Sequence, residues 1–262
     1  MRNRWVRAVI GFVWGLGLFF AIAYGLKFAL PSRPAGAAAE ASEAPLQKFE
    51  WNDPVVVSQA ALKGSMIVVA LIAWTMLGRP FRAMGWRKPD WRNRAHVVWF
   101  AVAIVTMMAT SAVMILLKSQ HPLAAKLTFL QLIVVIWLLS SFSEEIYVRG
   151  LVQSWISEHD DPNRNSILTP AIGSSALVFA AMHVPLIWTP AGLEGGLTIS
   201  TAMLFLGWAC AALRARSASL WSAIACHIVG NVAGLPGSFV GIILYRAIYG
   251  DFPDFVKAAM HR

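Results

Sequence analysis

Long hydrophobic runs separated by short polar stretches dominate the pattern of this chain. The runs predict helices over Ala8 to Leu30, Ser58 to Leu77, His96 to Leu117, Leu127 to Ile156, Ser166 to Trp188, Leu197 to Leu213 and Ser219 to Leu235, then a short segment from Phe239 to Tyr249 after a break at Pro236 and Gly237. About 20 helical residues span the hydrocarbon core of a bilayer. We therefore expect an all-α fold, a polytopic transmembrane helical bundle of about seven to eight helices; whether 239–249 spans or lies in the interface stays open.

The composition supports a membrane protein. Of the 262 residues, 58% are hydrophobic and only 13% are charged, and no polar stretch is long enough to form a soluble domain. The net charge of +9 would suggest a nucleic-acid partner in a soluble protein. Here the basic residues flank the apolar runs, so we expect the lipid bilayer as a partner and no nucleic acid. Cys210 and Cys226 lie in apolar runs without CxxC spacing and are predicted to be buried thiols.

Charge in the polar stretches predicts the orientation. The amino-terminal stretch from Met1 to Arg7 and the loop 79–94 are basic, whereas the linker 31–54 is acidic and rich in alanine and proline. The positive-inside rule then places the amino terminus and loop 79–94 in the cytoplasm and the linker in the periplasm. The first run is longer than a signal-peptide core, so we expect a retained helix in a multi-pass protein of the bacterial plasma (inner) membrane. Lys63 is expected near the outer end of its helix, where its side chain can reach the interface.

A charged motif interrupts the fourth apolar run at Ser143 to Arg149. Charges near the centre of a membrane helix cost about 2.5 to 3.5 kcal/mol each on insertion scales, so such residues tend to be functional. On a helix Glu145 and Arg149 are spaced i,i+4 and can pair, while Glu144 points about 100° away and keeps its carboxylate for another partner. The plain structural alternative is an ion pair that locks two helices together.

Polar residues also fall within the fifth and seventh runs. At 1.5 Å per residue, Glu144 lies about 20 Å, His183 about 25 Å and His227 about 12 Å from the cytoplasmic ends of their helices. Helix tilt allows all three to meet in the cytoplasmic half of the bundle. His227 shares a face with Asn231, and His183 shares one with Phe179. A lone membrane histidine such as His183 is also compatible with a simple interhelical contact. Four further histidines near helix ends or in loops have no expected role: His96, His121, His159 and His261.

Three motifs on successive apolar runs resemble those of the CPBP family, which contains type II CAAX prenyl endopeptidases and bacteriocin-processing or self-immunity proteins. They are Glu144-Glu145-x-x-x-Arg149, Phe179-x-x-x-His183 and His227-x-x-x-Asn231. The resemblance covers roughly residues 127–235. It divides the chain into N-terminal transmembrane helices (1–120), a catalytic CPBP-like core (121–250) and a C-terminal tail (251–262).

The resemblance implies an intramembrane endopeptidase, a hydrolase with Glu144, His183, His227 and Asn231 as catalytic residues. Glu144 would activate water with His183 as its partner, and His227 with Asn231 would hold the oxyanion. Glu145, Arg149 and Phe179 would be structural support. The substrate would be a membrane-associated peptide or protein that arrives from the membrane or the cytoplasmic side.

Two alternatives stay open at this point. The family is commonly called a metalloprotease, and Glu144, His183 and His227 have the composition of a zinc site. Because these residues come from three helices without a histidine pair at i,i+4, the pattern favours water activation without metal, and no cofactor is assigned beyond Zn²⁺ as the alternative. A non-catalytic scaffold or a transporter could also place such polar groups at mid-membrane.

Overall fold

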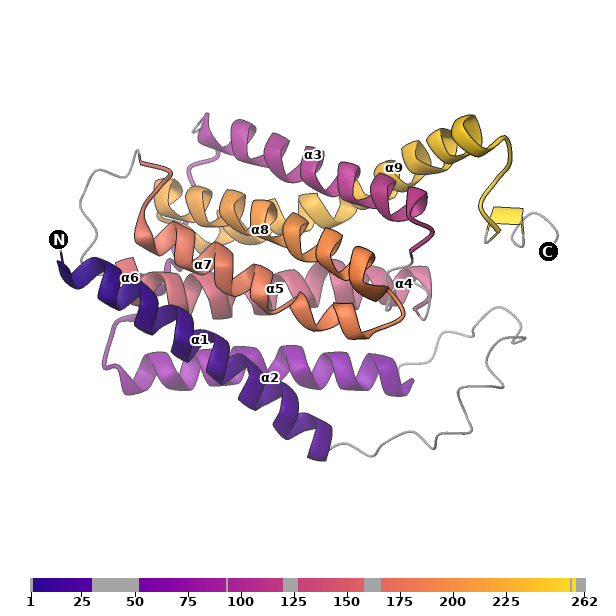
Figure 1. The fold of residues 1–262 in the computed structure, drawn as a ribbon. Helices are drawn as coiled ribbons and strands as arrows, with labels where there is room; N and C mark the ends of the chain where they lie inside the picture. Colours follow the sequence, from indigo (N-terminus) through magenta and orange to yellow (C-terminus); the bar gives the residue numbers. More distant parts are fainter. Residues whose placement is uncertain are drawn as a thin grey trace.

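The computed structural model describes residues 2–29, 52–92, 94–119, 127–157, 166–254 and 256–257. Figure 1 shows an elongated bundle of helices that run roughly along one axis. In chain order the elements are α1 (Arg2–Ala29), α2 (Pro54–Met76), η3 (Phe81–Met84), α3 (Ala95–Leu116), α4 (Phe129–Gln131), η4 (Leu132–Ser140), α5 (Ser141–Glu145), η5 (Ile146–Gln153), α6 (Ser154–Ser157), α7 (Pro170–Ala181), η6 (Val184–Trp188), α8 (Gly192–Ser217) and α9 (Leu220–Tyr249).

Seven helical stretches among the described residues are long and apolar enough to cross a membrane. The elements α4 to α6 join into one of them, Phe129–Ser157, and α7 with η6 forms another, Pro170–Trp188. The prediction of an all-α, polytopic membrane bundle is therefore confirmed. The chain is a multi-pass membrane protein.

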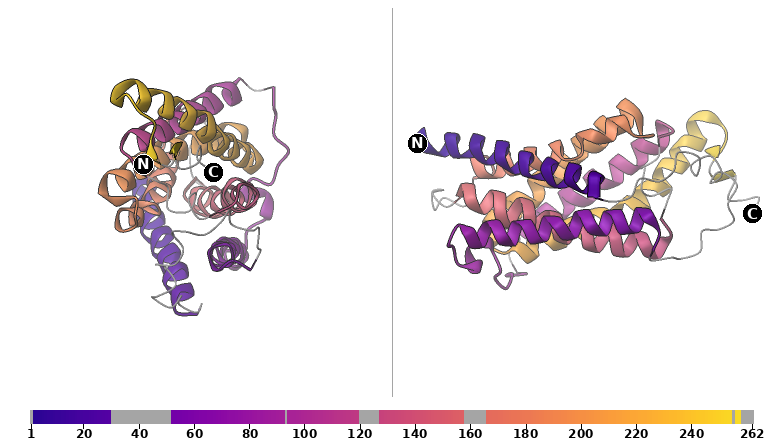
Figure 2. Two further views of the ribbon diagram at one scale, coloured as in Figure 1. Left: turned by 90° about the vertical axis from the view of Figure 1, so that its right-hand side faces the viewer. Right: turned by 90° about the horizontal axis from the view of Figure 1, so that it is seen from below.

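The helix Phe129–Ser157 lies inside the bundle. Its segments contact α2 on one side and α8 and α9 on the other, and the view along the bundle shows it between these neighbours (Figure 2). This helix carries the first motif. Residues from several surrounding helices can therefore reach the motif directly.

Local capping sets the start of α2, and Lys63 therefore lies deeper in the helix than predicted. The Asp53 side chain accepts a hydrogen bond from Val55 N at 2.7 Å, and Pro54 occupies the first turn, where its missing N–H is not needed. The helix therefore begins four residues earlier than predicted from Ser58. Lys63 then lies well inside the span and is only 7% exposed, so its predicted place at the interface is wrong.

Proline has two different effects in the fifth span. Pro170 starts α7, four residues after the predicted start at Ser166, beside the N-cap Thr169, whose hydroxyl accepts a hydrogen bond from Ile172 N at 3.2 Å. Pro185 does end regular α-helix, because α7 stops at Ala181 and the chain continues as the 3₁₀ helix η6. His183 consequently lies at the junction between two helical segments.

The predicted break at Pro236 and Gly237 is wrong. The helix α9 continues from Leu220 through both residues to Tyr249. Membrane helices tolerate proline because neighbouring groups satisfy the freed backbone carbonyl. Gly237 has a packing reason of its own, since a Cβ atom at this position would lie 2.4 Å from Met108 O on α3. The two backbones therefore approach too closely for any larger residue.

The bundle has two chemically different ends (Figure 1). At one end α1, α3 and α9 begin, and α2 and α8 terminate. We call it the basic end, because arginine and lysine gather there. These residues are Arg4, Arg7, Arg79, Arg82, Arg87, Lys88, Arg92, Arg94, Arg214 and Arg216. The opposite end, where α2 and α8 begin and α3 ends, is the far end. The predicted periplasmic linker falls largely outside the described residues, as do His121, His159 and His261.

Candidate active site

The two acids of the first motif lie in a short α-helical segment between two π-helical ones. The segment α5 ends at Glu145, with η4 before it and η5 after it. Glu144 is 3% exposed and both Glu145 and Arg149 are fully buried. π-Helical turns are uncommon and occur frequently at functional sites, because they change which side chains share a face.

The Glu145–Arg149 pair predicted from the i,i+4 spacing is present. Arg149 Nη1 donates to Glu145 Oε1 at 2.9 Å, and Arg149 Nη2 donates to the backbone carbonyl of Gly207 on α8 at 2.7 Å. The guanidinium group also lies over the Phe179 ring, with Cζ 4.6 Å from the ring centre. Arg149 therefore links the first motif to α7 and α8.

Glu144 has a cationic partner that the sequence analysis did not assign. Lys63 Nζ of α2 forms an ion pair with Glu144 Oε1, and Ser140 Oγ donates to the same oxygen at 2.7 Å. The two buried acids are thus matched by two buried bases, Arg149 and Lys63. A buried charge is tolerated only when it is paired and hydrogen-bonded, and each of the two acids has such a basic partner.

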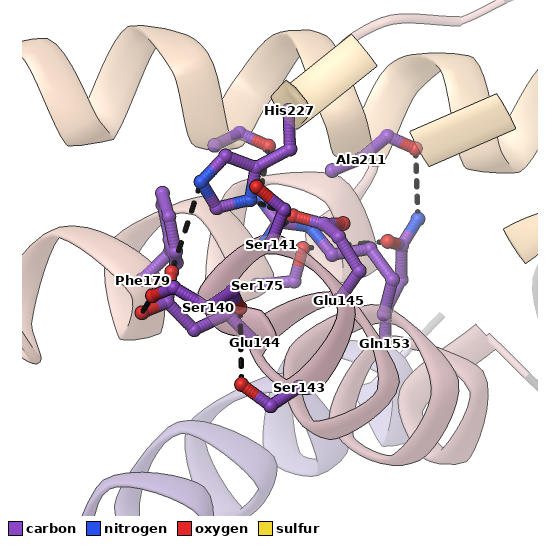
Figure 3. Close-up of polar contacts among 12 residues, drawn as sticks. Ser140, Ser141, Ser143, Glu144, Glu145, Gln153, Ser175, Phe179, Ala211 and His227 are labelled. Atoms are coloured by element: carbon purple, nitrogen blue, oxygen red, sulfur yellow. Dashed lines mark hydrogen bonds and ion pairs between the residues drawn. The ribbon is translucent and has the colours of Figure 1, made fainter. Parts of the chain in front are cut away.

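His227 of α9 lies between the two carboxylates, as Figure 3 shows. Its Nδ1 is 2.9 Å from Glu145 Oε1, and its Nε2 is 3.7 Å from Glu144 Oε2. An ionised carboxylate only accepts hydrogen bonds, so Nδ1 is the donor to Glu145. This contact fixes the orientation of the ring and directs Nε2 toward Glu144.

Phe179 and His183 form the third side of the site. His183 Nδ1 donates to the Phe179 carbonyl oxygen at 2.8 Å, which leaves Nε2 available for other partners. The Phe179 ring lies edge-on to both histidines, at 5.0 Å from His183 and 5.3 Å from His227 between ring centres. One buried aromatic ring therefore contacts Arg149 and both histidines.

Asn231 lies one turn beyond His227 on α9. Its Nδ2 donates to Ser141 Oγ at 3.0 Å and to Ile136 O at 3.4 Å. The amide is half-buried and borders the cavity described next. Its N–H groups are therefore available to a carbonyl oxygen only if one of these two contacts is exchanged.

A cavity of about 690 Å³ brings these residues together. Glu144, His183, His227 and Asn231 all line it, as does Lys63. Most of the remaining wall is apolar and includes Met107, Met114, Leu132, Ile136, Trp137, Met203 and Leu235. Ligand pockets commonly have this size and this combination of apolar wall and few polar groups.

The arrangement does not fit a metal ion. Across the described ranges, no group of three or more His, Cys, Asp or Glu side chains is arranged to hold one. The zinc alternative is disfavoured at Glu144, because Oε1 already contacts the Lys63 ammonium group and the Ser140 hydroxyl. A second cation at this carboxylate would be repelled by Lys63.

The sequence analysis missed several polar residues of the site. Lys63 could have been found from the Asp53-Pro54 capping signal, which moves the helix start and places a lysine deep in an apolar span. Gln153 donates to Ala211 O at 2.9 Å and lies beside Ser175, but nothing in the pattern marks it. His96, which was given no role, is buried and lies 3.0 Å from Ser222 Oγ. It does not line the cavity.

Comparison with known proteins identifies the segment that contains the site. Residues 126–233 match the family model described as type II CAAX prenyl endopeptidase Rce1-like. The matched segment includes all three motifs, from Glu144 to Asn231. No curated protein and no solved structure matches the chain.

Proposed function

Because residues 126–233 belong to the type II CAAX prenyl endopeptidase (Rce1-like) family, we propose that this membrane protein is an intramembrane endopeptidase that uses Glu144 to activate water. Support comes from one observation above all: the polar residues of three separate motifs line a single cavity inside the bundle. A membrane-associated peptide or protein is the proposed substrate class.

In the proposed reaction Glu144 is the general base. It takes a proton from a water molecule while the water oxygen bonds to the carbonyl carbon of the scissile peptide. The C=O π electrons move to oxygen and form an oxyanion. When the C–N bond breaks, the proton passes to the leaving amine, so the products are a carboxyl group and an amine. His183, with its free Nε2 at the cavity, is the proposed partner of Glu144 in these transfers.

His227 and Asn231 are the proposed oxyanion donors. Fixed donors in a water-poor site stabilise developing charge strongly, and removal of one such donor typically lowers kcat about 100- to 1000-fold. His227 Nε2 can donate only when the ring is protonated, because Nδ1 already carries the proton given to Glu145.

Glu145, Arg149 and Phe179 are proposed to support the site without contacting substrate. Glu145 orients His227, and Arg149 holds Glu145 through its i,i+4 contact. Phe179 packs against the guanidinium group and both histidine rings. These contacts keep the catalytic groups in fixed relative positions, which the chemistry requires.

The test compares a Glu144→Gln strain with the wild type. Glutamine keeps the shape of the side chain but removes the base, so a general-base contribution of about 100- to 10,000-fold should be lost. Membrane and secreted peptides are quantified by mass spectrometry, and cleavage products should disappear while their precursors accumulate. Equal abundance of the inserted variant is checked by immunoblot.

Glu194→Gln is the matched control. Glu194 is exposed in the first turn of α8 and does not line the cavity, so this variant should give the wild-type peptide pattern. A Glu144→Gln strain with an unchanged peptide pattern, at equal protein abundance, would favour the non-catalytic scaffold instead.

A further inference from the structure

Most of the cavity lining lies in one half of the bundle. On α3 its lining begins at Met107 and continues beyond the end of the helix to Ser119. On the helix Phe129–Ser157 it runs from Leu132 to Glu144 and includes none of the residues that follow. On α2 and α8 the lining residues also lie toward the far end: Gln59, Leu62, Lys63, Ile199 and Met203. On α9 the lining begins at His227, nearer the basic end, and continues through Asn231, Gly234 and Leu235 to Ser238.

The loop between α2 and α3 covers the site from the basic end. Its 3₁₀ helix η3 buries Met84 completely, and the Met84 side chain packs against Gly150 of η5. Gly85 O accepts a hydrogen bond from Leu220 N at 2.8 Å, and Arg87 O accepts one from Ser219 Oγ at 2.6 Å. The loop is thus fixed to the start of α9.

An aromatic cluster connects this loop to α5 and α9. The Trp86 ring lies 6.2 Å from Phe142 and 5.4 Å from Trp221, and Phe142 lies 6.1 Å from Trp221. Phe142 precedes Glu144 by two residues on the same helix. The three rings therefore connect the basic loop to the start of α9 and to the helix that carries Glu144.

The charge distribution relates these two ends to the membrane. Lysine and arginine flanking short loops mark the cytoplasmic side of a multi-pass protein. The basic end carries most of the described arginines, whereas the described residues of the far end include Asp53, Glu194, Asp251 and only a few bases. The positive-inside rule places the basic end in the cytoplasm. The far end then faces the other side.

We propose that substrate reaches Glu144 from the non-cytoplasmic side, through the far-end half of the cavity, and that the bound segment is an apolar stretch of peptide. The proposal rests on the proposed peptidase function and differs from the expectation that substrate arrives from the membrane or the cytoplasmic side. The cavity wall supports an apolar segment because methionine, leucine, isoleucine and tryptophan supply 12 of the 26 described residues that line it. Flexible methionines adapt to apolar side chains of different shape, so the site would accept more than one sequence.

Cysteine labelling in spheroplasts tests the side of access. Ser238→Cys and Gln59→Cys each place a thiol on the far-end wall, and Lys88→Cys places one on the exposed basic loop as the matched control. The native Cys210 and Cys226 are fully buried, so the unsubstituted protein should remain unlabelled. The reagent is a membrane-impermeant maleimide. We expect it to label both cavity variants from outside, and Lys88→Cys only after the membrane is permeabilised.

Other labelling patterns would overturn the proposal. External labelling of Lys88→Cys, with the cavity variants labelled only after permeabilisation, would place the far end in the cytoplasm. If Lys88→Cys and the cavity variants were labelled from the same side, the cavity would open toward the basic end. If neither cavity variant were labelled under any condition, the far-end wall would not be open to water.

The labelling result does not depend on catalysis. The expected labelling pattern can therefore be found even if the Glu144→Gln strain shows no change in peptides. Unchanged peptides would contradict only the peptidase function. A second measurement tests the side of access and the peptidase function together. Peptides whose cleavage depends on Glu144 should be cut at the non-cytoplasmic end of a membrane segment, either just outside the membrane or just within it. Cleavage sites confined to cytoplasmic segments would overturn the side of access and leave the peptidase function intact.

Discussion

Adjacent acids in the first motif have different neighbours, which gives their substitutions different expected effects. Glu145 contacts both Arg149 and His227 and is fully buried. Glu144 instead contacts Lys63 and Ser140 and borders the cavity. A glutamine at 144 changes the chemistry of the cavity, whereas one at 145 changes a pair that holds the bundle together.

Glu145→Gln should lower stability because Arg149 then lacks its carboxylate partner. Breaking a buried ion pair by removing one partner costs about 3 to 5 kcal/mol. The measurement is the Tm of the purified protein in detergent, alongside Glu144→Gln and the double variant Glu145→Gln/Arg149→Met, which removes the unpaired charge and should recover part of the loss. If Glu144→Gln proved the unstable variant and Glu145→Gln the stable, inactive one, the roles given to the two acids would have to be exchanged.

Lys63 is a positioning residue in this site, since it acts through Glu144. Lys63→Met keeps a similar side-chain length but removes the cation that holds Glu144 Oε1, so kcat should fall about tenfold or more with a smaller change in KM. Lys63→Arg retains the charge and should restore part of the activity. Lys88→Met on the exposed basic loop should have no effect. Equal losses in the Met and Arg variants would show that packing rather than charge explains the role of Lys63.

At the scale of elements, the contact between α3 and α9 positions half of the site, because α9 carries His227 and Asn231. Gly237→Ala would force a Cβ atom to within 2.4 Å of Met108 O, so the two helices must move apart. Overpacking of this kind costs typically about 1 to 3 kcal/mol. We expect a lower Tm and reduced activity, both measured on detergent-purified protein.

Gly64→Ala is the control for that substitution. Gly64 lies inside α2, and a Cβ atom there would meet nothing within 4 Å. Alanine is favoured over glycine inside a helix by about 1 kcal/mol, so this variant should keep or slightly raise the Tm. If Gly237→Ala were as stable as Gly64→Ala, the close approach of α9 and α3 would not be needed for the fold.

At the scale of the whole molecule, the charges around the cavity determine what chemistry it can support. Two carboxylates, one ammonium group and one guanidinium group are already paired among the described residues, so the site is electrically balanced without a further cation. A metal ion bound at Glu144 Oε1 would have to displace Lys63.

We therefore expect activity to survive removal of metal. Purified, active protein is dialysed against a strong chelator, and zinc is measured by elemental analysis before and after. The expected result is unchanged activity with far less than one zinc per chain. Roughly one zinc per chain, with activity lost on dialysis and restored by zinc, would contradict this and make His183 and His227 the ligands.

The sequence by itself determined the features that depend on neighbours along the chain. Hydrophobic run length predicted the membrane spans, because a bilayer of fixed thickness requires helices of a certain length. The i,i+4 spacing predicted the Glu145–Arg149 contact, and helical periodicity placed His227 and Asn231 on one face. The prediction failed at Pro236, where packing against α3 and not local propensity determines that the helix continues.

Only the tertiary structure decided which distant residues meet. Lys63 and Glu144 are 81 residues apart, and Glu145 and His227 are 82 apart, so no local pattern could pair them. The same reason applies to Phe179, whose ring lies between groups from three segments, and to the aromatic cluster of Trp86, Phe142 and Trp221. The direction in which the cavity opens depends on how all these helices pack, because it is a property of the space between them and of no single segment.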